Sequence, residues 1–215
     1  MTRLLARDFR LDDDDDDDDE DDAKERKTKK PEDQPGGMVA KRLFDARIVM
    51  IFGEINMKVA RDVSAQMLAM AQASDDPIRV VINSPGGHVE SGDTIHDMCR
   101  FVGPRVIVIG TGWVASAGAL IFLGAEKDSR FCLPNTRFMM HQPMGGVRGQ
   151  ATDIDIEAAE IIKMRKRIDA VIARETGQDL KKVEKDTDRN YWLSAEEAVD
   201  YGLASKIVAN LDEAA

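Results

Sequence analysis

Short apolar runs alternate with stretches of helical apolar spacing, and this alternation limits the possible folds more than any other feature of the chain. Residues 47–52, 78–82 and 105–109 are apolar runs with the length of buried strands. Residues 56–73 and 89–102, which separate them, carry apolar side chains at the spacing of one helix face. Strands joined through helices run parallel, with right-handed crossovers. The sequence therefore predicts an α/β fold built from parallel β-α-β units.

Ser116 lies at the centre of a stretch of small residues that follows the third predicted strand. That strand is expected to stop at Gly110, and the residues from Ala115 to Ala119 are small and compatible with a helix. A serine at a strand-to-helix turn exposes its hydroxyl beside the free amides of the helix N-terminus. The stretch lacks the G-x-S-x-G form, since Val114 stands at the first glycine position. Two interpretations remain: a nucleophile, or small residues that let one helix pack tightly on the sheet.

Two loops are expected at the carboxyl edge of the sheet, where α/β proteins bind their ligands. One loop is residues 83–87 and the other is residues 110–116. A glycine such as Gly87 can turn its amide outward where a side chain would clash. We therefore predict an oxyanion site formed by the N–H groups of Gly87 and Ala117 beside Ser116. The alternative is an ordinary tight turn.

His141 is the candidate general base because it ends a predicted buried strand, residues 137–140, at the same edge of the sheet. A structural histidine at a strand end is the alternative. The other histidines, His88 and His96, are expected on or near a helix surface.

The N-terminal segment differs from the rest of the chain in composition. Residues 1–37 hold 15 acidic and 8 basic residues, so they carry −7 of the formal net charge of −10. Like charges repel and little here can be buried, so residues 1–38 are predicted to be a disordered acidic tail or a prosegment. Residues 39–215 are predicted to be the folded domain. That part is near neutral, which argues against nucleic-acid binding.

Several classes of protein are excluded by the sequence. No apolar run is long enough to span a membrane, and the first residues lack the core of a secretory signal. No HExxH or CxxC motif suggests a metal site, and no cofactor is expected. The two cysteines, Cys99 and Cys132, fit a reducing cytoplasm better than a disulfide framework, and both are expected to be buried.

The second half of the chain is predicted to contain further elements. Residues 151–176 have the apolar spacing of one long helix, and residues 130–135 are expected to form a loop. Ser194 with Glu197 three positions later has the form of a capping box, which predicts the start of a last helix.

Taken together, these motifs resemble the Clp peptidase (ClpP) family. The matching stretches are INSPGG at residues 82–87, ASAGA around Ser116, RFCLPNTRFMMHQP at 130–143, GGVRGQATDIDIEA at 145–158 and LSAEEAVDYGL at 193–203. The resemblance implies a crotonase-like wedge whose subunits stack as two seven-membered rings around a proteolytic chamber. Residues 145–176 resemble the protruding handle that joins the rings.

By the same resemblance, Ser116 is the nucleophile, His141 the general base, and Gly87 and Ala117 the oxyanion amides. The third position departs from the family, because the triad aspartate falls on Asn190. An asparagine oxygen accepts a hydrogen bond from a histidine N–H but offers no negative charge to an imidazolium. Catalysis by these residues is therefore expected to be weak or conditional.

Asp186 and Asp188 are alternative carboxylates close to Asn190 in sequence. Asp188 and Arg189, however, match positions that the family uses for contacts between rings. We therefore expect a Ser116–His141–Asn190 site, with Asp186 and Asp188 as the alternatives for the orienting residue.

A second departure concerns the partner of such a ring. Aromatic positions of the family's ATPase-docking pocket read Arg79 and Val81 here, whereas Phe131 is retained. The acidic tail replaces the family's apolar gating segment. Docking of an AAA+ Clp ATPase is therefore an open question.

Three hypotheses for the function follow. The first is a cytoplasmic serine endopeptidase subunit of a ClpP-like ring, which cleaves unfolded proteins or peptides through an acyl-enzyme. The second is a weakly active or inactive structural or regulatory subunit that assembles with a ClpP paralogue, a reading that Asn190 favours. The third is a crotonase-like acyl-CoA enzyme, which the context of His141 and the handle motif disfavour. Thermal protection by CoA would separate the third from the others.

Overall fold

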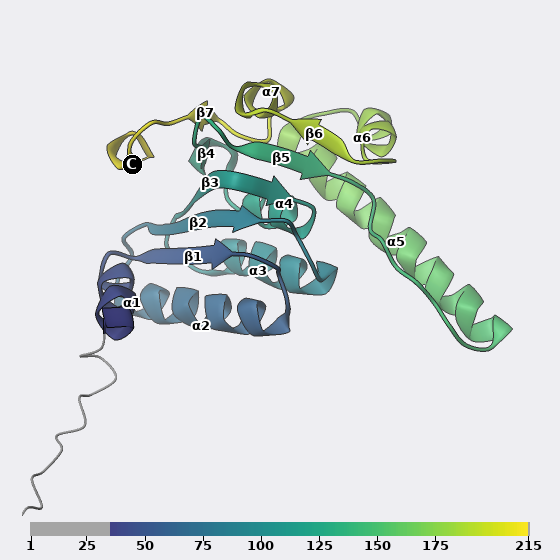
Figure 1. Ribbon diagram of the computed structural model, residues 1–215, viewed down its shortest axis with the longest axis horizontal. Coiled ribbons are helices and arrows are strands. Elements are labelled where there is room, and N and C mark those ends of the chain that lie inside the picture. Colours follow the sequence, from purple (N-terminus) through teal and green to yellow (C-terminus); the bar gives the residue numbers. More distant parts are fainter. Residues whose placement is uncertain (1–34, 215) are drawn as a thin grey trace, which may run out of the picture.

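The computed structural model describes residues 35–214 (Figure 1). Residues 1–34 and 215 lie outside the described residues, so the acidic tail over residues 1–38 stays a prediction. Helix α1 (Pro35–Asp45) begins ahead of the domain start expected at residue 39.

A mostly parallel sheet forms the centre of the molecule and confirms the predicted α/β fold class. Its main path runs in the order β1-β2-β3-β4-β7. These strands are β1 (Ile48–Phe52), β2 (Ile78–Ser84), β3 (Val106–Ala115), β4 (Arg130–Cys132) and β7 (Lys206–Ile207). Strand β5 (Arg137–Met140) pairs in parallel with the end of β3, and β6 (Tyr191–Leu193) pairs antiparallel with β5.

Helices α2 (Met57–Ala73), α3 (Val89–Phe101) and α4 (Ala117–Phe122) follow β1, β2 and β3 and cover one face of the sheet (Figure 1). Side chains of β2 alternate between buried and half-buried positions, so one face of this strand forms the core. The opposite face of the sheet is less covered. Met50 and Phe52 of β1 are 46% and 50% exposed.

Two predicted boundaries are wrong. Strand β3 does not stop at Gly110 but continues to Ala115, because its two halves find different partners, β4 and then β5. Gly112, whose φ is +57°, lies at the register shift between these halves. Residues 130–132, expected in a loop, form β4 because they pair with both β3 and β7.

His96 is also placed differently from the prediction. Its side chain faces the core from α3 and is 6% exposed, rather than lying on the helix surface. Cys99 and Cys132 are buried, as predicted. Burial raises the pKa of the Cys99 thiol to about 12 and that of the Cys132 thiol to about 11, so both remain protonated at neutral pH.

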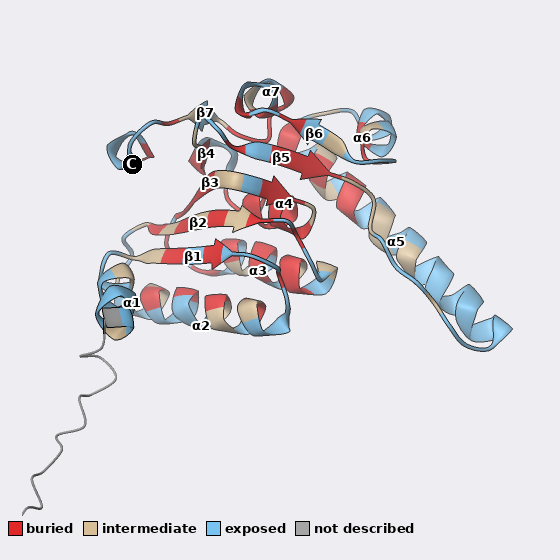
Figure 2. Cartoon of the chain, in the orientation of Figure 1, coloured by how far each residue is buried: buried red, intermediate tan, exposed pale blue. Residues whose placement is uncertain are grey.

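Helix α5 (Ala151–Thr176) is the predicted long helix, and it projects away from the sheet (Figure 1). Its buried residues lie in its C-terminal half, whereas its N-terminal half is exposed (Figure 2). Gly177 ends the helix in the left-handed conformation. Helices α6 (Leu180–Asp186) and α7 (Ala195–Tyr201) follow, and Ser194 with Glu197 forms the predicted capping box at the start of α7. Short 3₁₀ segments are η2 (Lys127–Ser129) and η3 (Leu211–Ala214).

Candidate active site

Ser116 occupies the sharp turn between β3 and α4, with a φ of 54° and a ψ of −121°. A positive φ costs a residue with a side chain about 1–3 kcal/mol, so surrounding structure has to hold it. The Ser116 N–H donates to Met139 O at 2.8 Å, and Ser116 O accepts from the N–H groups of Ala119 and Leu120 at 2.9 and 3.2 Å. The turn is therefore fixed on both sides by backbone hydrogen bonds.

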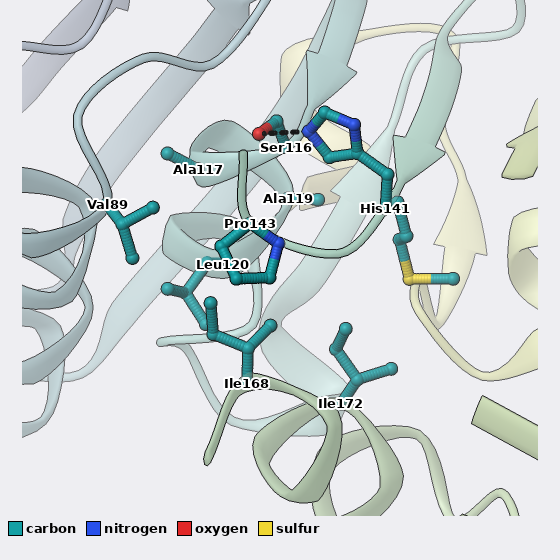
Figure 3. A pocket seen from close by; sticks show the side chains of 10 residues that line it. Val89, Ser116, Ala117, Ala119, Leu120, His141, Pro143, Ile168 and Ile172 are labelled. Carbon is teal, nitrogen blue, oxygen red and sulfur yellow. Dashed lines mark hydrogen bonds between the residues drawn. The ribbon is translucent and has the colours of Figure 1, made fainter. Parts of the chain in front are cut away.

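His141 directly follows β5, at the carboxyl edge of the sheet, and its ring lies between two side chains. Its Nε2 lies 2.8 Å from Ser116 Oγ (Figure 3), and its Nδ1 lies 3.0 Å from Asn190 Oδ1. An amide oxygen only accepts hydrogen bonds, so this pairing puts the ring hydrogen on Nδ1. Nε2 is then free to accept the Ser116 hydroxyl proton.

Asn190 reaches His141 through the pairing of β5 with β6. The register of this antiparallel pair sets Tyr191 opposite Met140. The residue before β6 therefore lies beside the residue after β5. The pairing of β5 with β6 therefore brings together His141 and Asn190, which are 49 positions apart in the sequence.

The alternative carboxylates are engaged elsewhere. Asp186 accepts a hydrogen bond from the Tyr201 hydroxyl at 2.9 Å and pairs with Lys182 at 2.8 Å. Asp188 pairs with Arg165 at 3.2 Å. Of the candidate orienting residues, Asn190 is the one that the structure brings to the histidine.

Gly86 and Gly87 lie against the backbone of Ile55 and the side chain of Ser116. A Cβ at Gly86 would approach Ser116 Cβ to 2.6 Å, and a Cβ at Gly87 would approach Ile55 O to 2.2 Å. Ile55 donates to Gly86 O and accepts from the His88 N–H, each at 2.9 Å, which makes a parallel bridge around Gly87. In such a bridge the N–H of the central residue points to the other side. The Gly87 amide therefore faces away from Ile55.

Ala117 is the first residue of α4, so its N–H has no carbonyl one turn earlier in the helix to donate to. The loops that carry Gly87 and Ala117 follow the adjacent parallel strands β2 and β3. The two amides predicted for the oxyanion site thus come from neighbouring loops that both border Ser116.

A small apolar pocket of about 30 Å³ adjoins Ser116 and His141 (Figure 3). Its other lining residues are apolar and are Val89, Ala117, Ala119, Leu120, Met140, Pro143, Ile168 and Ile172. Ile168 and Ile172 come from the buried end of α5, one turn apart. Sequence reasoning missed this pocket, because helical spacing in residues 151–176 predicts a buried face without predicting which loop that face covers.

Within residues 35–214, no group of three or more His, Cys, Asp or Glu side chains is arranged to hold a metal ion. No helix in the same range is long and apolar enough to cross a bilayer.

A strand-to-helix turn that presents a serine to a histidine, which is itself bonded to an amide oxygen, has the arrangement of a serine hydrolase on an α/β sheet. The family model described as Clp protease matches residues 32–211. The chain belongs to the Clp protease family.

Known relatives agree with this assignment. The ATP-dependent Clp protease proteolytic subunit 2 of Gluconobacter oxydans is 61% identical over 186 residues, which cover 86% of this chain and 83% of the relative. The subunit of the same name from Pseudomonas aeruginosa is 49% identical over 187 residues, which cover 86% of this chain and 93% of the relative. The solved structure of ClpP1 from Listeria monocytogenes has 54% sequence identity and a TM-score of 0.75, and the match covers 82% of this chain and 99% of that one.

The fold is thus the ClpP fold, and the chain is a Clp-type serine endopeptidase subunit. Membership of this family implies a subunit that forms rings and works with a Clp ATPase.

Proposed function

We propose that peptide-bond hydrolysis is carried out by Ser116 as nucleophile, His141 as general base and acid, and Asn190 as the residue that orients the histidine. The observation that carries this proposal is the continuous chain of hydrogen bonds from Ser116 Oγ through both ring nitrogens of His141 to Asn190 Oδ1. Each hydrogen bond in this series runs in the direction that acyl transfer requires: Ser116 donates to His141, and His141 donates to Asn190.

In the first step, His141 Nε2 takes the Ser116 hydroxyl proton while Oγ attacks the scissile carbonyl. The N–H groups of Gly87 and Ala117 stabilise the negative charge that develops on the carbonyl oxygen. The imidazolium then gives its proton to the leaving amine, and an acyl ester forms on Ser116. Water, deprotonated by the same nitrogen, hydrolyses the ester and restores the hydroxyl.

The amide at Asn190 sets a limit on this mechanism. Its oxygen fixes the tautomer of His141 but adds no negative charge to stabilise the imidazolium formed during each transfer. We therefore propose that the rate of proton transfer, rather than the attachment of substrate, limits turnover in this subunit.

The apolar pocket beside the nucleophile supports a preference for an apolar substrate side chain. Ile168, Ile172 and Leu120 offer no hydrogen-bond partner from their side chains, so a charged side chain buried there would be desolvated without compensation. The substrates we propose are peptides and unfolded proteins, in which such side chains are accessible.

We further propose that the subunit assembles into two stacked rings of seven, alone or with a ClpP paralogue, in the cytoplasm. Two exposed apolar surfaces support assembly. One is the sheet face with Met50 and Phe52, and the other is the projecting half of α5 with Ile154 and Ile156, which are 40% and 56% exposed. A Clp ATPase would deliver unfolded chains to the chamber, through a docking pocket in which Arg79 and Val81 replace aromatic residues of the family.

A fluorophosphonate probe tests the nucleophile directly. We expect the assembled protein to gain one adduct by intact mass, Ser116→Ala to gain none, and His141→Ala to react much more slowly. If the assembled wild type fails to react, with or without a paralogue, the chain is a structural subunit and the proposed mechanism is wrong.

A further inference from the structure

A network of polar groups ties together the two segments that carry His141 and Asn190. Gln142, directly after His141, donates its backbone N–H to Thr187 O at 2.6 Å and its side-chain amide to Asp188 O at 2.8 Å. These bonds hold the segment before Asn190 against the end of β5. They do so independently of the hydrogen bond between the histidine and the asparagine.

Arg165 of α5 contacts both sides of this pairing with a single guanidinium. One terminal nitrogen donates to Gln142 Oε1 at 3.0 Å, and the other donates to Asp188 Oδ1 at 3.2 Å. Its Nε lies 3.8 Å from Asp169 Oδ2, one turn further along α5. Because a guanidinium is planar with donors at fixed angles, it holds its partners at fixed positions relative to one another.

Asp169 closes the network from the buried side. Its side chain is 3% exposed, and its Oδ1 accepts a hydrogen bond from the Thr187 hydroxyl at 2.8 Å. Burial raises the pKa of this carboxyl, while the bond from Thr187 and the charge of Arg165 act in the opposite direction. The guanidinium is therefore anchored on α5 as well as on the two segments.

We propose that Arg165 is a positioning residue of the active site. It acts through Gln142 and Asp188 to fix the separation between the segment that carries His141 and the segment that carries Asn190. The proposal rests on the catalytic roles given above and deepens them. The competing interpretation is an ion pair without consequence for catalysis, since the Arg165 side chain is 33% exposed and Asp188 is 56% exposed.

The neutral orienting group makes such positioning matter more. A carboxylate attracts an imidazolium over a range of positions, because charge acts in all directions. An amide oxygen holds the ring through one directional hydrogen bond, which weakens steeply as its angle departs from linear. A small displacement of Asn190 therefore rotates the His141 ring, and this changes the alignment of Nε2 with Ser116 Oγ.

Kinetics of the assembled full chain on a fluorogenic peptide test the proposal. Arg165→Met should lower kcat roughly ten- to a hundredfold and leave KM within about twofold, because alignment is lost while the substrate pocket is intact. Arg165→Lys should fall in between, since an ammonium lacks the planar fork. The matched control is Lys166→Met, the exposed neighbour on the same helix, which removes one charge without touching the network and should behave as wild type.

A second background separates positioning from simple loss of structure. In Asn190→Ala the orienting group is absent, so adding Arg165→Met should cost less than about twofold more in kcat. An equal loss in both backgrounds, or a raised KM with unchanged kcat, would overturn the proposal. If Arg165→Met does not assemble, Gln142→Met removes the side-chain bonds of Gln142 to Arg165 and Asp188 instead. The same loss of kcat, with KM unchanged, is then expected. Absence of a fluorophosphonate adduct on wild-type Ser116 would instead contradict the proposed function itself.

Discussion

At the scale of single residues, the oxygen that orients His141 belongs to an amide. Asn190 Oδ1 lies 3.0 Å from His141 Nδ1, so the geometry of the pair is that of a bonded orienting group. What the pair lacks is charge. Asn190 keeps the hydrogen bond that a catalytic carboxylate would make to His141 but lacks its negative charge, so the two contributions can be studied separately at this position.

Asn190→Asp should therefore raise kcat by about tenfold or more, because a carboxylate stabilises the imidazolium formed in each proton transfer. Peptidase turnover at saturating substrate measures the effect, with Asn190→Ala as the control that should fall below wild type. Unchanged turnover, with assembly intact, would mean that the charge at this position does not limit the reaction.

His96 gives a second prediction at this scale, on stability rather than catalysis. Burial lowers the pKa of its imidazole, and the nearby charge of Arg100 acts in the same direction, against a hydrogen bond to Asp97. The folded pKa lies below the ordinary value of 6.5, so as pH falls below 6.5 the unfolded chain takes up a proton that the folded chain does not. Stability is thus lost as pH falls from 6.5 toward the folded pKa.

Thermal unfolding at pH 7.5 and pH 5.5 checks this sign. The wild type should lose more of its Tm between the two values than His96→Gln, whose side chain does not titrate. An equal loss in both proteins would show that other groups set the pH dependence.

The residue scale is also where sequence reasoning reached furthest. Ser116, Gly87 and Ala117 lie within short motifs whose local backbone decides their geometry, so a strand-to-helix turn was predictable from neighbours in sequence. The partner of His141 was placed at Asn190 by the family resemblance and not by the local sequence, because this contact depends on the register of β5 against β6. That register places Asn190 beside the histidine and leaves Asp188 turned toward Arg165.

At the scale of elements, one arginine joins the start of β1 to the end of α2. Arg47 donates to Met70 O at 2.7 Å, in the last turn of α2, and to Ser74 O and Asp76 O at 3.1 and 2.7 Å in the following loop. A guanidinium suits these positions because the last carbonyls of a helix lack partners within it and carry partial negative charge.

Arg47→Met should destabilise the fold by about 2 kcal/mol, since four carbonyls, Pro77 O among them, lose a charged donor. Arg61→Met is a suitable control, because Arg61 is exposed and pairs with its sequence neighbour Asp62. Denaturant unfolding of both variants measures the difference. The proposal fails if the two variants lose the same amount of stability.

Elements with local signals were predicted well, and those that depend on distant partners were not. Helix α2 with its cap at Asn56 and helix α7 with its capping box carry their signals in their own residues. The short strand β4 carries no such signal, because three residues become a strand through pairing on both sides. The extension of β3 past Gly110 has the same origin.

At the scale of the whole molecule, the described chain leaves apolar groups exposed in two places. Phe52 ends β1 and is 50% exposed, and Ile156 lies in the N-terminal half of α5 and is 56% exposed. Figure 2 shows that half of α5 as exposed. An isolated subunit would keep both in water, whereas assembly into rings would bury apolar surface of this kind.

The proposed stacking of two rings through α5 puts Ile156 at their contact. Ile156→Asp should then weaken that contact, and sedimentation at micromolar concentration should give about half the mass of the wild-type particle. The neighbouring exposed residue Asp155 provides a control, Asp155→Asn, which should sediment as wild type. A full-mass particle from Ile156→Asp would place the ring contact on another surface.

The positive φ of Ser116 affects which residues evolution can select at this position. Ser116→Ala and Ser116→Gly both remove the hydroxyl, but glycine alone occupies a positive φ without penalty, so the glycine variant should unfold at the higher temperature of the two. Selection for thermal stability alone would therefore favour glycine at position 116. A serine is retained there only under selection for peptidase activity.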